Sequence, residues 1–198
     1  MNATLFDTTT ISANGKSVYE NALESLQSEI DRTQEIFIRE HFRHYPNQPS
    51  DAWKVLEVAS IGTLSKMYKS LKDHLPEKSI IANDMGINSP PVFSGWLEAI
   101  VCIRNIIAHH SQLWGYNMTK IPSARLNNPS GKWFINPLTD VQKKKPFLII
   151  SCMIYICDKI SPENEIKNKI LKLIETNPTI PIYKIGFLNQ WKNEPLWK

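Results

Sequence analysis

The sequence predicts an all-α fold, a bundle of about five or six helices with a long irregular basic loop after the fourth of them. Apolar residues recur at helical spacing over residues 22–38 and again over residues 53–71. Residues 147–160 are apolar nearly all round, which favours a central buried helix, with a pair of strands as the alternative. The chain has no internal repeat and no glycine-rich phosphate loop.

The first predicted helix begins at a capping box. Residues 1–14 are polar and threonine-rich, so we expect a flexible lead-in there. Ser17 and Glu20 are spaced so that the hydroxyl and the carboxylate would satisfy free amides at a helix start. The apolar pattern continues to about Phe42, which predicts one long helix before the break at residues 45–49.

Two further helices precede the middle of the chain. Ser50 or Asp51 can cap a helix that runs to about residue 75. A glycine inside it, Gly62, costs about 1 kcal/mol relative to alanine, which indicates close packing of another backbone. Pro76 begins a shorter helix that Gly86 would end.

The fourth helix carries the most reactive side chains of the chain. Ser89 and Pro90 resemble an N-cap and a first-turn proline, so this helix starts near residue 91 and has residues 103–110 in its last turns. Residues 115–145 then form a long basic connection, and such length without regular structure is often functional.

The remainder is helical and ends in an aromatic tail. Ser161, Pro162 and Glu163 begin an amphipathic helix that ends near residue 175. Residues 178–198 are expected to be extended and to pack on the bundle through Tyr183, Phe187, Trp191 and Trp197. A length of 198 residues favours a single domain over residues 1–198.

Composition favours a cytoplasmic protein. The hydrophobic fraction of 42% and charged fraction of 21% are ordinary for a globular chain, and no signal-peptide pattern is present. The longest apolar run, residues 147–157, is shorter than the roughly 18 residues of a membrane span. Cys102, Cys152 and Cys157 form no C-x-x-C pair, so buried free thiols are favoured over a disulfide or a zinc site.

Positive charge is concentrated around the end of the fourth helix. Residues 99–160 hold eight basic and two acidic residues, a net charge of +6, whereas the remainder holds 15 basic and 17 acidic residues, a net charge of −2. This distribution is expected if the partner is a polyanion such as RNA. A solvated loop with scattered lysines would give the same count.

Three kinds of site chemistry can be tested on the residues Arg104, Asn105, His109 and His110. A metal site is disfavoured because adjacent histidines on a helix point about 100° apart and no acidic residue follows before Asp140. A serine nucleophile lacks an elbow motif. Metal-free RNA cleavage fits best and needs no cofactor: an imidazole moves protons while a cation stabilises the phosphorane formed by 2′-hydroxyl attack.

Helix geometry constrains such a site. Asn105 and His109 lie about 40° apart on an ideal helix, but Arg104 and His109 lie about 140° apart. Arg104 and His109 would therefore face one phosphate only if the helix end unwinds or a second subunit contributes. In isolation, a short R-N-x-x-x-H pattern is also consistent with a structural ion pair and a helix-capping histidine.

The motif has a family context. Residues 97–114, together with residues 53–68 and 185–197, resemble the Abi-like (AbiD/AbiF) abortive-infection family of the helical HEPN superfamily. The resemblance covers about residues 17–198. It implies a metal-independent ribonuclease site assembled across a homodimer, with Arg104, Asn105 and His109 matching the family's R-x4–6-H motif and His110 its second histidine.

The same resemblance implies a biological role and leaves alternatives open. The family acts in phage defence as toxin-like ribonucleases, in some members held in check by an antitoxin or regulatory RNA. Two departures are an N-terminal helical region shorter than the family's and Gly115-Tyr116 before the expected asparagine, Asn117. The alternative function is a non-catalytic RNA-binding or regulatory module. In either case a basic set would guide the RNA backbone: Arg125, Lys132, Lys143, Lys144 and Lys145.

Overall fold

The computed structural model describes residues 3–123 and 133–198, and over these ranges the chain is all-helical, as predicted. Ten α-helices and three short 3₁₀ helices occur in the described residues, and their only β-structure is two isolated bridges, Phe6 with Leu71 and Ile11 with Ser17. Contacts divide the chain into two compact units, Met1–Lys78 and Ser79–Lys198. A single domain over the whole chain stays a prediction.

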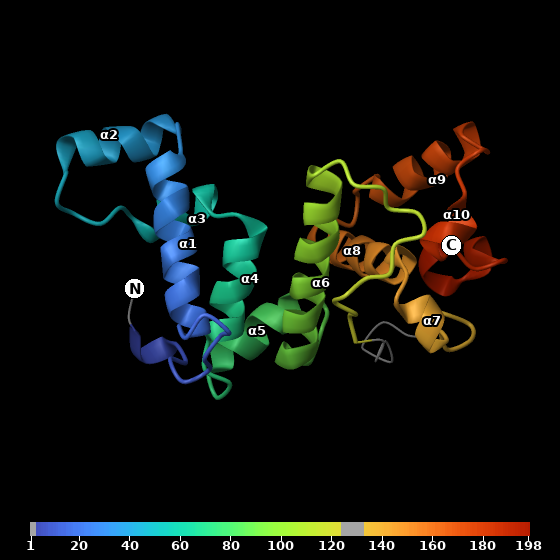
Figure 1. Cartoon of the computed structure of the whole chain (residues 1–198), viewed down its shortest axis with the longest axis horizontal. Helices are drawn as coiled ribbons and strands as arrows, with labels where there is room; N and C mark the ends of the chain where they lie inside the picture. Colours follow the sequence, from blue (N-terminus) through green and yellow to red (C-terminus); the bar gives the residue numbers. More distant parts are fainter. Residues whose placement is uncertain (1–2, 124–132) are drawn as a thin grey trace. The chain divides into compact units, whose positions relative to one another are not determined.

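The first unit is built on two helices that pack side by side, α1 (Val18–Arg32) and α4 (Ile61–Ser70) (Figure 1). Two shorter helices, α2 (Ile36–His44) and α3 (Ala52–Val58), complete the unit. Its core is formed by Ala22, Leu26, Val55 and Met67.

Both long helices predicted in this unit are broken, so the sequence underestimated the number of helices. Thr33 is extended, and its hydroxyl accepts a hydrogen bond from the Glu35 amide at 3.2 Å, which competes with helix continuation. The second break lies at Ala59 and Ser60, where the Ser60 hydroxyl caps α4 by accepting from the Thr63 amide at 3.2 Å. Gly62 therefore lies in a first helical turn, where its cost is small.

The N-terminal segment is not the loose lead-in that its composition predicts. Phe6 is buried and stacks on Tyr19 with ring centroids 4.4 Å apart, and the Asp7 amide donates to the Ser70 carbonyl at 2.7 Å. Hydrogen bonds from Thr10 and Thr9 lower the pKa of Asp7 to about 2. One buried aromatic ring is enough to anchor a polar segment, and composition alone does not reveal it.

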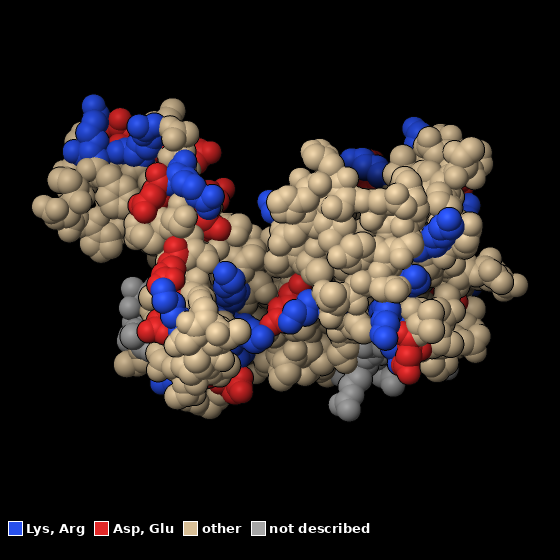
Figure 2. Space-filling model, in the orientation of Figure 1, with Lys and Arg blue, Asp and Glu red and all other residues tan. Residues whose placement is uncertain are grey.

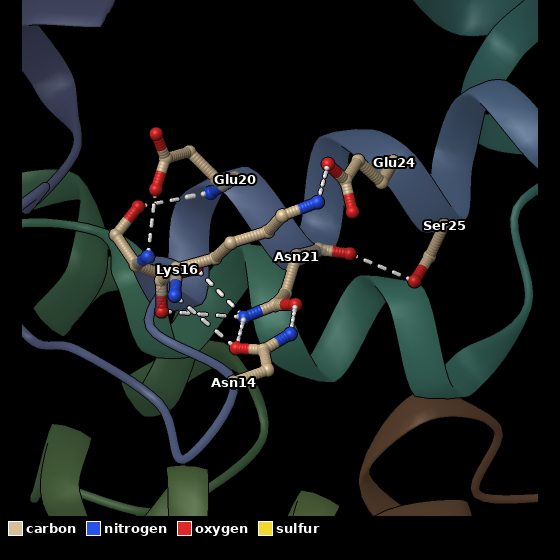
Figure 3. A network of polar contacts seen from close by, with 7 residues as sticks. Asn14, Lys16, Glu20, Asn21, Glu24 and Ser25 are labelled. Carbon is tan, nitrogen blue, oxygen red and sulfur yellow. Dashed lines mark hydrogen bonds and ion pairs between the residues drawn. The ribbon is translucent and has the colours of Figure 1, made fainter.

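The capping box at the start of α1 is confirmed. The Glu20 amide donates to the Ser17 hydroxyl at 3.1 Å, and the Ser17 amide donates to the Glu20 carboxylate at 2.7 Å. Figure 3 shows these bonds within a wider polar network, in which Asn14 bonds Asn21 and Lys16 pairs with Glu24. The network fixes the turn that leads into α1.

The second unit is built around α8 (Pro146–Ile160), which is confirmed as a central buried helix. The other helices of this part of the chain are α5 (Pro76–Asp84, which begins in the first unit), α6 (Pro90–Ala108), α7 (Asp140–Lys143), α9 (Ile166–Thr176) and α10 (Ile182–Ile185). Helix α6 packs on α8, and three aromatic rings meet at their contact: Trp96, Trp133 and Tyr155.

The aromatic tail closes the other end of α8. Trp197 stacks on Phe147 at 5.5 Å, and its indole N–H donates to the Ser151 hydroxyl at 3.2 Å. Phe187 and Trp191 are also buried, as predicted. The prediction for Tyr183 is wrong, because this side chain is 70% exposed on the short helix α10, with the Lys184 ammonium 6.0 Å from its ring. The tail is also not extended throughout, since α10 and two 3₁₀ turns interrupt it.

The long connection after α6 contributes to the core. Met118, Trp133, Phe134 and Leu138 are buried, and residues 140–143 form α7. The described parts of the connection, residues 115–123 and 133–139, are irregular as expected but contribute buried side chains, and only α7 departs from the prediction of an irregular loop up to residue 145. All three cysteines are free, and only Cys152 is fully buried, which raises the pKa of its thiol.

Within the described ranges, α6 alone has the length and apolar composition to cross a membrane. The core helix of a folded protein meets the same two criteria. Helix α6 buries Phe93, Trp96, Ala99, Ile100 and Ile103 within the second unit, so its apolar residues are explained by packing.

The link between α1 and α4 gives the first prediction. The Glu29 carboxylate accepts hydrogen bonds from the Ser60 amide and the Thr63 hydroxyl, each at 2.9 Å. Desolvation raises the pKa of Glu29, but these bonds outweigh it, so the folded-state pKa lies below its ordinary value. We expect Glu29→Gln to lower the free energy of unfolding by about 1 kcal/mol at pH 7 in urea titrations.

The pH dependence of this loss has a definite sign. A depressed folded-state pKa stabilises the fold above the ordinary carboxyl pKa, and this stabilisation is lost as the pH falls through the folded-state pKa. The difference in the free energy of unfolding between wild type and Glu29→Gln should therefore become smaller toward pH 3. Glu24→Gln on the same helix removes only an exposed ion pair with Lys16 and should cost little. An equal loss in both variants, or a gap unchanged at pH 3, would contradict the assignment.

Candidate active site

The predicted motif lies at the exposed C-terminal end of α6. The buried residues of α6 anchor the helix in the second unit up to Ile103, and the reactive residues follow directly. Arg104, Asn105, His109 and His110 are all exposed to solvent. All four side chains are thus available to a ligand or a partner chain.

The hydrogen-bond pattern shows where the helix ends. The His109 amide donates to the Asn105 carbonyl at 3.1 Å, so helical bonding continues as far as His109. The His110 amide then donates to Ile107 and the Ser111 amide to Ile106, each at 3.0 Å. This pair of bonds is the Schellman arrangement, which closes a helix through a residue in the left-handed conformation.

His110 occupies that left-handed position. Its φ is 54°, and among the described residues it is the one non-glycine residue with a positive φ. Glycine is the usual residue there because a Cβ atom is unfavourable in this conformation. The chain has a histidine at a position where glycine would make the fold more stable.

The geometry at the end of α6 speaks against one of the two ways of bringing Arg104 to His109, the unwinding of the helix end. The helix does not unwind before His109, so the angle of about 140° between the two side-chain directions is retained. One straight helix end does not turn both groups toward one phosphate. If Arg104 and His109 act on the same phosphate, a second chain would have to supply one of them.

The sequence suggests that Asn105 orients the imidazole or bonds the phosphate, and in the structure its side chain contacts a third group. Its side-chain oxygen accepts a hydrogen bond from the Arg104 guanidinium at 3.1 Å. Asn105 therefore orients the guanidinium in this structure, rather than the imidazole of His109. The amide still lies on the same helical face as His109, one turn earlier.

The segment that follows the motif is pinned to other elements of the second unit. The Gly115 amide donates to the Lys184 carbonyl at 3.0 Å, and the Met118 amide donates to the Lys144 carbonyl at 2.7 Å. The Lys145 ammonium donates to the Asn117 side chain at 2.8 Å. The lysine run after the connection and the start of the tail thus both lie beside the motif's loop.

The predicted RNA-binding residues are only partly brought together. Lys144 is exposed near the loop, Lys145 is bonded to Asn117, and Lys143 pairs with Asp140 at 2.9 Å. Two others, Arg125 and Lys132, lie outside the described residues. On the face seen in Figure 2, the lysines and arginines of the second unit are dispersed rather than gathered in one patch.

Sequence reasoning missed Lys184 and Tyr183, because only the tertiary bond from Gly115 places α10 beside the motif. No local pattern in the tail signals this. Among the residues that the structure describes, no three histidine, cysteine or acidic side chains are grouped so that they could hold a metal ion.

Comparison with known families identifies the chain. The model of the Abi-like protein family matches residues 1–115. The chain belongs to this family. The match includes the whole arginine–histidine motif, and it ends before the connection and the tail. Searches of curated proteins and of solved structures found no match. Family membership points to abortive infection, a form of phage defence.

The unusual conformation of His110 gives the second prediction. His110→Gly should raise the free energy of unfolding by about 1 kcal/mol, because glycine adopts a positive φ without the Cβ penalty. Urea or thermal unfolding measures the change. The matched control is His109→Gly, since His109 has a φ of −90° and gains nothing from glycine. If both variants lose stability equally, His110 is not strained.

Proposed function

We propose that this Abi-like protein is a metal-independent endoribonuclease of the HEPN type that acts as a toxin-like effector in phage defence. The observation that carries the proposal is the exposed Arg104, Asn105, His109 and His110 set at the end of α6 in a chain of this family. RNA is the substrate class because it alone carries the 2′-hydroxyl that can attack its own phosphate.

Each residue has a role in this chemistry. The His109 imidazole transfers protons, removing one from the 2′-hydroxyl or delivering one to the leaving 5′-oxygen. The Arg104 guanidinium binds the phosphate and stabilises the charge that develops on it. Asn105 positions that guanidinium through the 3.1 Å hydrogen bond, and His110 assists from the strained turn next to His109.

The proposed site is composite. Intact hydrogen bonding as far as His109 keeps Arg104 and His109 on different sides of α6. A homodimer in which two α6 ends meet supplies an arginine from one chain and a histidine from the other. The exposure of all four side chains is compatible with such a meeting.

The proposed biology follows from the family. A ribonuclease that cleaves cellular RNA during infection would halt phage replication along with the host. Such an activity requires restraint in uninfected cells, and an antitoxin or regulatory RNA is the partner we propose for that restraint. The protein would then work in the cytoplasm, where phage and host RNA are present.

RNA cleavage in excess EDTA tests the proposal. Wild-type protein should cleave RNA to products with cyclic-phosphate ends. His109→Ala should lower the rate by about 10²- to 10⁴-fold, the usual contribution of a general acid–base group. Arg104→Ala should lower it by about 10²-fold or more. His74→Ala, at an exposed histidine of the first unit, is the matched control and should leave the rate unchanged.

The possible results separate the alternatives. RNA binding without cleavage, equal in wild type and His109→Ala, would instead support a non-catalytic RNA-binding module. Loss of cleavage in EDTA would point to metal-dependent chemistry and contradict the proposal.

A further inference from the structure

Two aromatic side chains that follow the motif are exposed, whereas the other tryptophans of this unit are buried. Trp114 is 43% exposed and Tyr116 is 37% exposed, and they lie four and six residues beyond His110. Four other tryptophans of the second unit each have at most 5% of their surface exposed: Trp96, Trp133, Trp191 and Trp197. The rings of Trp114 and Tyr116 therefore present faces that the core does not use.

The backbone that carries these rings is fixed. The Gln112 side chain donates to the Trp114 carbonyl at 3.2 Å, and the Tyr116 amide donates to the Leu113 carbonyl at 3.3 Å. Between the two rings, Gly115 has a φ of 80° and its amide is bonded to α10. The rings are thus held on a turn of defined shape.

Positive charge and a third ring adjoin the turn. The bond from Gly115 to the Lys184 carbonyl brings the backbone of α10 next to the turn, and the bond from Met118 to the Lys144 carbonyl brings Lys144 next to the residues that follow it. Tyr183, Lys184 and Lys144 are exposed. Residues 111–123 contain no acidic residue.

The turn combines exposed aromatic rings with neighbouring lysines, and its sequence contains no carboxylate. This combination suits single-stranded nucleic acid. Unpaired bases stack on aromatic side chains, while lysines neutralise the phosphates between them. In a duplex the base faces are covered by neighbouring base pairs, so a stacking surface discriminates against double-stranded RNA.

We propose that Trp114, Tyr116 and Tyr183 form a stacking surface for unpaired RNA bases, with Lys144 and Lys184 on the phosphates. The proposal rests on the ribonuclease function and deepens it by naming single-stranded RNA as the substrate class. It places the strand next to His109, so the bases held on the turn are those flanking the cleaved bond.

Binding measurements on the His109→Ala protein test the surface without cleavage. A fluorescent single-stranded 10-mer should bind, and the added Trp114→Ala change should weaken the affinity about tenfold or more. Trp114→Phe should keep most of the affinity, because phenylalanine still offers a ring. Trp53→Ala is the matched control, since Trp53 is 64% exposed in the first unit, and it should have no effect.

An abasic 10-mer separates stacking from charge. It keeps the phosphates but has no bases, so it should bind more weakly than the normal strand and be insensitive to Trp114→Ala. A duplex of the same length should also bind more weakly than the single strand. Cyclic-phosphate cleavage by the wild-type protein, measured in parallel, reports separately on the ribonuclease function.

Several results would overturn the stacking surface. If Trp114→Ala binds the single strand as tightly as its parent protein does, the stacking surface is contradicted but the ribonuclease function is not. Equal affinity for duplex and single strand would do the same. Conversion to a monomer by Trp114→Ala, with RNA affinity per chain unchanged, would assign the rings to a protein interface. An absence of RNA binding and of cleavage would reject both proposals together.

Discussion

The hydrogen bonds of α6 continue without interruption to the amide of His109, and the proposed site depends on this continuity. Helix α6 is held in place by the packing of Trp96, Ala99 and Ile103 inside the second unit. Because the last turn stays regular, Arg104 and His109 point about 140° apart. In the proposed site each chain therefore supplies only one of the two groups that act on a given phosphate.

The turn that ends α6 links this constraint to the rest of the unit. His110 takes the left-handed conformation, and the chain then leaves the helix toward Trp114 and Tyr116. Bonds from Gly115 and Met118 fix that path against α10 and the end of α7. A histidine in the left-handed backbone conformation and two exposed rings therefore lie within residues 110–116, where glycine and buried rings would give greater stability. Such a combination is typical of a functional site.

The parts of the fold that could be predicted from sequence are those governed by local patterns. The capping box at Ser17, the buried helix α8 and the end of α6 near the motif all follow from short-range spacing. The breaks at Thr33 and Ser60 were missed because polar side chains there capture backbone amides in competition with the helix. The anchoring of Phe6 and the exposure of Tyr183 depend on tertiary packing, which no local pattern reveals.

The same distinction holds for the site. Arg104, Asn105, His109 and His110 are close in sequence, so their placement at one helix end was predictable. Their exposure and the bond between Arg104 and Asn105 were not, since both depend on the surroundings. Lys184 lies far along the chain and reaches the loop only through the backbone bond from Gly115.

Mixing two inactive variants tests the composite site most directly. Arg104→Ala and His109→Ala proteins, unfolded and refolded together, should form mixed dimers in which one site receives His109 from the first variant and Arg104 from the second. With random pairing about half of the dimers are mixed and each has one intact site, so RNA cleavage should return to about a quarter of the wild-type rate. No recovery, with mixed dimers shown to form, would contradict a site shared between two chains.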